Sequence, residues 1–248
     1  MTSHNPFSLK GRTVFVTGAS SGIGKSIAIE CSKMGANMIV SGRNRKRLAE
    51  TYDHLDGAGH RQIIADMTNK DDIDNITNPL PRLDGVVLCA GIVKTLPVKH
   101  IKDDAIEEVF QTNITSSIQI IKRLLKAKKI NKGASVIFIS SIAANHPKPG
   151  NALYSATKGA VNAFGKVLAL ELAPLKIRVN MIQPGFIKTN LLSSGIISEE
   201  QIDEHYKRYP LGPGKPEDVS HACVYLLSDA AEWITGSIFT IDGGITLK

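Results

Sequence analysis

The sequence has no long hydrophobic run and few features that would divide it. No segment approaches the roughly 18 uninterrupted apolar residues that a membrane-spanning helix needs, and residues 1–10 are polar, without the apolar centre of a signal peptide. No proline-, glycine- and serine-rich linker interrupts the 248 residues, and no segment repeats. We therefore expect one domain over residues 1–248, in the cytoplasm and without contact to a membrane.

Cysteine is also scarce. The three cysteines, Cys31, Cys89 and Cys223, lie far apart and follow no metal-binding spacing. Cys31 and Cys89 fall within apolar patterns, so we expect buried free thiols in a reducing compartment and no metal site.

Acidic residues are fewer than basic ones, and the formal net charge is +7. Such an excess can indicate nucleic-acid binding. However, aromatic residues make up only 5% of the chain, and no zinc-finger, homeodomain or RNA-recognition pattern is present. We expect anionic small molecules or an acidic protein as partners, and no nucleic acid.

Short runs rich in valine, isoleucine and phenylalanine alternate with segments of helical periodicity. The expected strands are residues 13–17, 37–41, 62–65, 85–89, 135–140, 178–182 and 237–241, and the clearest helices are 23–34, 105–129, 152–173 and 216–227. Several strand runs are apolar throughout, which is typical of a parallel sheet covered on both faces. The pattern predicts a single-domain, doubly wound α/β Rossmann fold with a seven-stranded parallel sheet. Ligands bind at the carboxyl ends of such strands.

A glycine-rich turn follows the first strand. It has the sequence Thr17-Gly18-Ala19-Ser20-Ser21-Gly22-Ile23-Gly24 and opens the next helix. Glycine lets the backbone approach a pyrophosphate, whose charge the helix N-terminus stabilises. The spacing differs from the G-x-G-x-x-G fingerprint, and a plain strand-to-helix turn is the alternative. The residues that we assign to a cofactor site are Gly18, Ser20, Ser21, Gly22, Ile23 and Gly24.

The second strand is followed by Arg43 and has glycine, Gly42, where an acidic residue is common. NAD-binding sites usually place Asp or Glu about 20 residues after the glycines, to accept hydrogen bonds from the ribose. A guanidinium instead matches a 2′-phosphate. We therefore expect NADP(H) rather than NAD(H), with Arg43 as the phosphate ligand and the nearby Lys46 and Arg47 as a solvated helix face.

Two further strand ends extend the expected cofactor site. Asp66 follows the third strand, where its carboxylate could accept from the adenine amino group, and Met67 beside it is assigned to the same site. Ala90 and Gly91 follow the fourth strand and offer backbone with little side chain near the ribose. A lone aspartate after a strand is otherwise a turn residue or helix cap.

Tyr154 and Lys158 lie four residues apart at the start of a predicted helix, so they share one helical face. An ammonium near a phenol favours the phenolate and lowers its pKa. Tyr154 could then serve as general acid in reduction and general base in oxidation near neutral pH. The alternative is a chance pattern, in which a surface tyrosine lies beside a solvated lysine.

Two polar residues strengthen this assignment. Ser141 follows the preceding strand, where its hydroxyl can hydrogen-bond the substrate oxygen. Ser140 is the rival, but we expect strand alternation to turn it away. Asn113 lies mid-helix, where it could bend the helix or hold a water that relays protons to Lys158, with a local backbone bond as the alternative.

Together these motifs resemble those of the short-chain dehydrogenases/reductases over essentially the whole chain. The elements in that family's order and spacing are the glycine turn, Asn113, Ser141, the Tyr154 and Lys158 pair, Pro184-Gly185 and Ile241-Asp242-Gly243-Gly244. Residues 214–219 and 234–236 make the chain most similar to the 3-oxoacyl-[acyl-carrier-protein] reductases. One position departs from the pattern: Cys89 replaces the usual asparagine, which puts one hydrogen bond at the strand end in doubt.

The resemblance implies a catalytic tetrad of Asn113, Ser141, Tyr154 and Lys158, with hydride from NADPH. It implies the reduction of a carbonyl to a secondary alcohol, with a 3-oxoacyl thioester of fatty acid biosynthesis as substrate. A short-chain dehydrogenase acting on a sugar, steroid or bile-acid alcohol is one alternative. A nucleotide-binding protein without turnover is another.

The resemblance also implies that Ile187 and Thr189 contact the nicotinamide carboxamide. Residues 189–215 look like a substrate lid, whose larger apolar side chains are Leu191, Leu192, Ile196, Ile197 and Tyr206. His146 lies between Ser141 and Tyr154 in the sequence, where it either touches substrate or is a simple loop histidine.

Two surface patterns concern partners. A basic cluster could dock an acidic acyl carrier protein, or its cations could complement a helix C-terminus. It consists of Lys122, Arg123, Lys126, Lys128, Lys129 and Lys132. A small-residue stripe allows close helix packing, in the homotetramer that the resemblance implies or within the chain. It consists of Ala152, Ala156, Gly159, Ala160 and Ala163.

Overall fold

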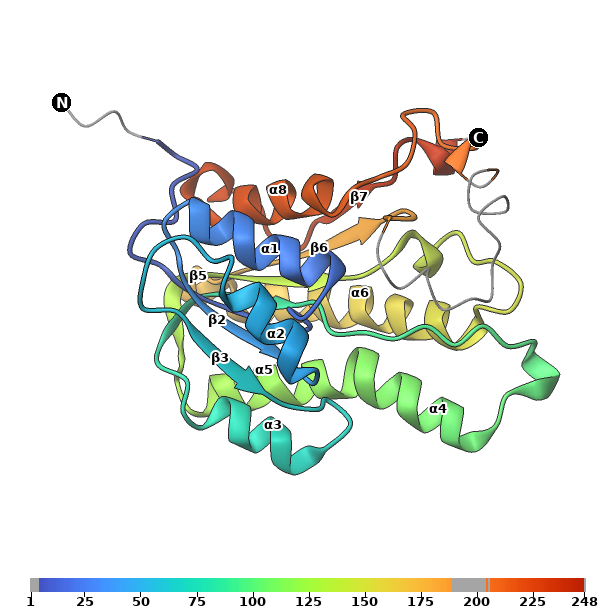
Figure 1. Cartoon of the computed structure of the whole chain (residues 1–248), viewed down its shortest axis with the longest axis horizontal. Coiled ribbons are helices and arrows are strands. Elements are labelled where there is room, and N and C mark those ends of the chain that lie inside the picture. The colour runs from blue at the N-terminus through green and yellow to red at the C-terminus, as the bar shows by residue number, and fades with distance from the viewer. Residues whose placement is uncertain (1–4, 189–203, 205, 248) are drawn as a thin grey trace.

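The structure is a computed structural model that describes residues 5–188, 204 and 206–247, and it has the predicted doubly wound architecture (Figure 1). One seven-stranded sheet has the order β3-β2-β1-β4-β5-β6-β7, with every neighbouring pair parallel. The strands are β1 (Thr13–Val16), β2 (Asn37–Gly42), β3 (Arg61–Ile64), β4 (Leu83–Leu88), β5 (Ile130–Ile139), β6 (Arg178–Pro184) and β7 (Ile238–Ile241).

Helices cover both faces of the sheet (Figure 1). One layer consists of α1 (Gly22–Lys33), α2 (Arg45–Tyr52) and α8 (Pro216–Leu227). The other consists of α3 (Lys70–Thr77), α4 (Asp103–Phe110), α5 (Ser116–Lys126) and α6 (Ala152–Leu172). Short 3₁₀ turns are η1 (Val98–His100), η3 (Ile142–Ala144), η4 (Ala173–Leu175), η6 (Asp229–Ala231) and η7 (Ile245–Leu247). Within the described ranges, no helix combines the length and apolar character needed to cross a membrane.

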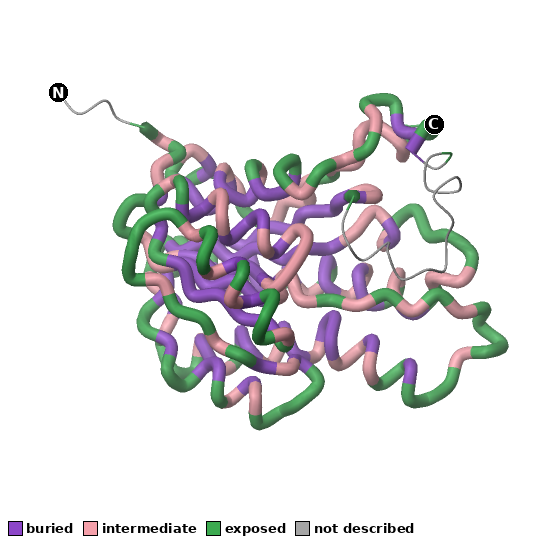
Figure 2. The backbone as a smooth tube through the Cα atoms, in the orientation of Figure 1, coloured by how far each residue is buried: buried purple, intermediate pink, exposed green. Residues whose placement is uncertain are grey.

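The strands are apolar at successive positions because both of their faces are covered. In β1, Val14, Phe15 and Val16 are all fully buried. Phe15 packs in the hydrophobic cluster on the α3, α5 and α6 side, whereas Val14 and Val16 pack in the cluster on the α1 and α8 side. Figure 2 shows this buried centre along the sheet. Each such side chain stabilises the fold by about 1.5–3 kcal/mol.

The predicted single helix over residues 105–129 differs from the structure in two ways: a π-helical turn interrupts it, and it ends at Lys126. It consists of α4 and α5, joined by the π-helical turn η2 (Gln111–Thr115), with Asn113 at the centre of the turn. The helix stops because Lys128 adopts the left-handed conformation, with φ of 53°. β5 then begins at Ile130 instead of the expected residue 135, because Ile130 pairs with Leu83 before a register shift in β4.

Candidate active site

The candidate catalytic residues meet at the carboxyl edge of the sheet. Ser141 follows β5, and Tyr154 lies in the first turn of α6. The hydroxyl of Tyr154 is hydrogen-bonded to Ser141, and the ammonium of Lys158 lies 5.5 Å from the centroid of the Tyr154 ring. Lys158 Nζ also donates to the carbonyl oxygen of Ile139 at 2.8 Å, which fixes the ammonium under the end of β5.

The two adjacent serines have different partners, as strand alternation predicts. Ser140 is buried, and its hydroxyl donates to the carbonyl oxygen of Lys158 at 3.2 Å. The Ser141 hydroxyl accepts from the backbone N–H of Ala143 at 3.1 Å, which begins η3. Only Ser141 therefore presents its hydroxyl to Tyr154.

Burial controls the titration of this group. Burial raises the pKa of Tyr154, and the nearby Cys89 raises it further. The hydrogen bond from Ser141 lowers this pKa, but by less than burial raises it. The direction in the structure is opposite to the expected lowering, because removing the phenol from water disfavours its anion more than the surrounding groups stabilise it. Burial also lowers the pKa of Lys158 to about 8. At neutral pH Tyr154 is protonated and Lys158 is mostly charged.

Asn113 connects the loop after β4 to α6. Its Oδ1 accepts from the backbone N–H of Ile92 at 2.8 Å, and its Nδ2 donates to the Ile92 carbonyl oxygen at 2.9 Å and to Thr157 Oγ1 at 3.1 Å. A Cβ added to Gly91 would lie 3.4 Å from Asn113 Oδ1 and 3.5 Å from Lys158 Nζ. The Asn113 side chain thus joins the loop after β4 to α6 beside the Lys158 ammonium. The bend expected at Asn113 is the π-turn η2.

The glycine turn is packed so closely that larger residues would not fit. Gly18 has φ of +68°, and a Cβ there would lie 2.8 Å from the backbone of Ala90. A Cβ on Gly24 would lie 2.3 Å from the carbonyl oxygen of Gly18. Ser21 is the N-cap residue of α1 but makes no side-chain capping bond, and the first turn contains no acidic residue. Backbone amides without a competing carboxylate fit a pyrophosphate group.

The end of β2 carries a basic residue and no acidic one. A Cβ on Gly42 would lie 3.0 Å from both Cβ and Oγ of Ser20, so a side chain at this position would require Ser20 to shift. Arg43 is exposed and forms no ion pair with any described residue. A guanidinium in this position can receive a 2′-phosphate.

Asp66 has a local role whether or not it contacts adenine. Its Oδ1 accepts from the backbone N–H of Thr68 at 2.9 Å and from the Thr68 hydroxyl at 2.8 Å. The turn expected as the alternative is therefore present. Met67 is buried, and Gln111 Nε2 donates to its carbonyl oxygen at 3.1 Å. Asp66 Oδ2 has no hydrogen-bond partner among the described residues and is the atom that could accept from a ligand.

Thr17 is a residue that the sequence analysis missed. Its Oγ1 accepts from the backbone N–H groups of Cys89 at 3.0 Å and Ala90 at 3.2 Å. Thr17 therefore fixes the end of β4, where Cys89 replaces the family's asparagine. Burial raises the pKa of the Cys89 thiol to about 12. The sequence signal for the role of Thr17 was its position directly before Gly18, which places its hydroxyl at the carboxyl end of β1.

The remaining expected contact residues lie around the same edge or outside the described residues. The Ile187 side chain is buried, with its Cδ1 2.6 Å from a Cβ built on Gly214, and the two residues form an isolated parallel bridge. Thr189 and the lid residues 189–203 and 205 lie outside the described residues. His146 lines a hollow of about 270 Å³ beside η3. The other lining residues are Ile142, Pro147, Lys148, Tyr209, Ile245 and Thr246.

The basic cluster lies at the opposite edge of the sheet from Tyr154 of the same chain. It spans the C-terminal half of α5 and the beginning of β5, and the candidate site lies where β5 ends. Arg123 pairs with Asp74. Lys129 Nζ donates to the carbonyl oxygens of Thr77 at 3.1 Å and Asn78 at 2.6 Å, at the C-terminus of α3. Lys129 thus fits the alternative of helix capping.

Most of the small-residue stripe of α6 faces outward, whereas Ala160 packs against the core. Ala152, Ala156 and Ala163 are exposed, and a Cβ on Gly159 would meet no atom within 4 Å. A helix crossing within the described part of the chain does not cover these residues.

Comparisons with known proteins agree with this geometry. The family described as enoyl-(acyl carrier protein) reductase matches residues 18–246. A 3-oxoacyl-[acyl-carrier-protein] reductase from Rickettsia felis is 33% identical over 240 residues, covering 96% of this chain and 98% of the relative.

Two solved structures have the same fold over nearly the whole chain. A short-chain type dehydrogenase/reductase from Mycobacterium ulcerans is 33% identical, with a TM-score of 0.86, covering 97% of this chain and 92% of the other. A candidate 2-deoxy-d-gluconate 3-dehydrogenase from Agrobacterium tumefaciens with bound NADP is 30% identical, with a TM-score of 0.89, covering 99% and 100%.

Proposed function

Because the chain belongs to the short-chain dehydrogenase/reductase family, we propose that it uses NADPH to reduce a 3-oxoacyl thioester to the secondary alcohol. The observation that carries the proposal is the hydrogen-bonded pair of Tyr154 and Ser141, with the Lys158 ammonium beside it. The thioester is supported by similarity to the Rickettsia felis reductase.

Each catalytic candidate has a distinct task in this proposal. When bound, NADPH supplies the hydride. Tyr154 donates a proton to the substrate oxygen, and its raised pKa keeps that proton available. Ser141 hydrogen-bonds the same oxygen and stabilises its developing charge. Lys158 contacts the cofactor ribose, and Asn113 positions the loop and helix that surround it.

The cofactor would be held at five strand ends. The glycine turn from Gly18 to Gly24, including Ser20, Ser21, Gly22 and Ile23, takes the pyrophosphate. Arg43 takes the 2′-phosphate, which selects NADPH over NADH. The other proposed contacts are Asp66 and Met67 with adenine, Ala90 and Gly91 with the ribose, and Ile187 and Thr189 with the carboxamide.

Turnover tests this proposal directly. Consumption of NADPH is followed with acetoacetyl thioesters, ketosteroids and keto-sugars, and we expect the highest kcat/KM with the thioester. Tyr154→Phe should lower kcat by about 10²- to 10⁴-fold while retaining NADPH binding. Tyr225→Phe is the control, because Tyr225 lies on α8 and makes ring contacts with Phe7 and Phe239. Unchanged turnover in Tyr154→Phe would remove the proposed acid. Cofactor binding without turnover of any substrate would favour a non-catalytic protein.

A sugar-acid alcohol is the second candidate substrate. The hollow next to η3 contains His146 and Lys148, and burial together with nearby Arg208 lowers the pKa of Lys148. A substrate carboxylate would favour the charged form of Lys148 and pair with it, and residues 189–215 would close over it as a lid. A higher kcat/KM for a keto-sugar acid than for the thioester would select this candidate.

An acyl carrier protein is the proposed donor of the thioester. We expect a lower KM for the carrier-linked substrate than for a small thioester analogue, because the carrier adds contacts outside the catalytic pocket. Equal KM values would argue against a carrier. The basic cluster faces away from Tyr154 of the same chain, so a carrier docked there could serve only a neighbouring copy.

We also propose a homotetramer that uses the outer face of α6. The small-residue stripe continues into Val167, which is 55% exposed, and Leu170, which is 77% exposed. Burying such side chains against another copy would stabilise an assembly. Sedimentation should show four chains for the parent and a smaller species for Ala163→Glu. The control is Lys46→Glu on α2, and a tetrameric Ala163→Glu would exclude this face.

A further inference from the structure

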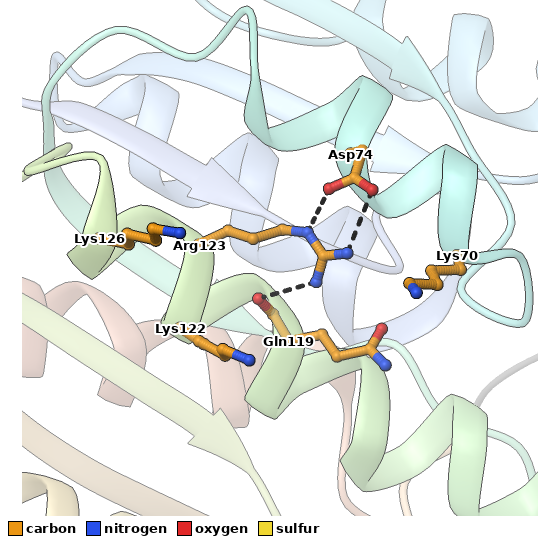
Figure 3. Close-up of a pocket in the computed structure, with 6 residues that line it drawn as sticks. All are labelled: Lys70, Asp74, Gln119, Lys122, Arg123 and Lys126. Carbon is orange, nitrogen blue, oxygen red and sulfur yellow. Dashed lines mark hydrogen bonds and ion pairs between the residues drawn. The ribbon is translucent and has the colours of Figure 1, made fainter.

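A second hollow lies between α3 and α5, away from the candidate active site (Figure 3). Its volume is about 440 Å³, which falls within the range of roughly 300–1,000 Å³ typical of small-molecule sites. The lining residues are Lys70 and Asp74 from α3, and Gln119, Lys122, Arg123 and Lys126 from α5.

The hollow has more positive charge than its carboxylate can balance. Arg123 reaches across from α5 to both oxygens of Asp74, with Nη2 donating to Oδ2 at 3.2 Å, and this contact lowers the pKa of Asp74. Lys70, Lys122 and Lys126 form no ion pair with any described residue. The lysines extend around the Arg123–Asp74 pair in Figure 3. Their mutual repulsion is relieved when an anion binds among them.

One polar atom of α5 also lacks a partner here. Gln119 Oε1 is buried and has no hydrogen-bond partner among the described residues. Arg123 Nη1 is directed to the carbonyl oxygen of Gln119 at 3.4 Å, so the guanidinium is fixed at both ends. A bound anion would accept from the ammonium groups, whereas Gln119 Oε1, which is an acceptor, would be satisfied by a protonated phosphate oxygen or by a water that accompanies the anion.

We propose that this hollow is a binding site for a small anion with two or three linked phosphates. Lysine ammonium groups bind phosphate as point charges, whereas the one planar guanidinium already engages a carboxylate. The hollow has only six lining residues, and a stable protein partner would need about 800 Å² on each side. The site is separate from Tyr154, because this half of α5 runs toward the opposite edge of the sheet.

Calorimetric titration of the full chain with inorganic tripolyphosphate tests the site. The titration uses the Arg43→Ala background with saturating NADH at about 0.15 M salt. The proposed 2′-phosphate ligand is then removed, the glycine turn is occupied by the cofactor pyrophosphate, and surface attraction is screened. We expect saturable binding of one tripolyphosphate per chain. Lys122→Gln and Lys126→Gln should each weaken it about tenfold, which is about 1.4 kcal/mol. The matched control, Lys166→Gln on the exposed side of α6, should leave it unchanged.

Three results would overturn the inference. They are the absence of saturable binding, equal weakening by Lys166→Gln, and binding of a hexaglutamate peptide as tight as that of tripolyphosphate. The last result would indicate a site for acidic peptides. Thermal unfolding of each variant verifies that the fold is retained. Because the readout is binding in a background without Arg43, failure of the proposed reductase activity would not affect it.

Discussion

Replacing Gly24 with alanine should separate the packing of the glycine turn from the stability of α1. The new Cβ would lie 2.3 Å from the carbonyl oxygen of Gly18 and 2.8 Å from its carbonyl carbon, whereas ordinary contacts begin near 3.4 Å. The turn must therefore move by about 1 Å, since carbon contacts are optimal at 3.5–4.0 Å. Overpacking of this kind costs about 1–3 kcal/mol, and alanine returns up to about 1 kcal/mol of helix propensity.

The free energy of unfolding should therefore fall by a net of about 0–2 kcal/mol, and cofactor affinity should fall at least tenfold, because the displaced peptide belongs to the proposed pyrophosphate contact. NADPH binding is measured by calorimetry and unfolding by urea titration. Lys33→Ala introduces alanine at the other end of α1 and serves as control. The reasoning is refuted if Gly24→Ala binds NADPH as tightly as Lys33→Ala and unfolds at the same urea concentration.

Three further predictions concern single side chains. Arg43→Ala should weaken NADPH binding about tenfold or more, with little effect on NADH, and equal weakening in calorimetry would contradict the phosphate assignment. Asn113→Ala should lower the free energy of unfolding by about 2–4 kcal/mol, because a buried side chain loses three hydrogen bonds, and an unchanged urea midpoint would contradict that role. Burial lowers the pKa of Lys158 from the ordinary lysine value of 10.5 to about 8 in the folded chain. Between these pH values the unfolded chain therefore holds more protons, and stability rises with pH. In urea titrations at increasing pH, the unfolding free energy of the parent should therefore rise relative to that of Lys158→Met by about 1.4 kcal/mol per pH unit. A difference between the two proteins that stays constant with pH would refute the burial of this ammonium.

The sheet could be predicted from the sequence because its signal is local. Each residue of β1 that is fully buried in the structure is hydrophobic in the sequence, and the glycine turn marks where α1 begins. Strand alternation also distinguished Ser141 from Ser140, since adjacent strand residues face opposite sides.

Other features depend on residues that are distant in the sequence. The Tyr154 pKa depends on how completely the fold removes the phenol from water, which the spacing to Lys158 does not reveal. Arg123 looked like part of a uniform basic surface, but its partner Asp74 lies 49 residues earlier. The start of β5 was missed because residues 131–133 are polar or glycine, and the pairing of Ile130 with Leu83 decides the boundary.

The strand order also bears on how the chain acquires its structure during synthesis. Val14 of β1 pairs with Met38 of β2 on one side and with Gly85 of β4 on the other. The first contact closes a short loop, whereas the second must wait until β4 has left the ribosome. Until then one edge of β1 has unpaired backbone groups and can associate with other nascent chains. Such non-local pairing slows folding, so expression at lower temperature or with chaperones should raise the yield of soluble protein more than changes at the surface would.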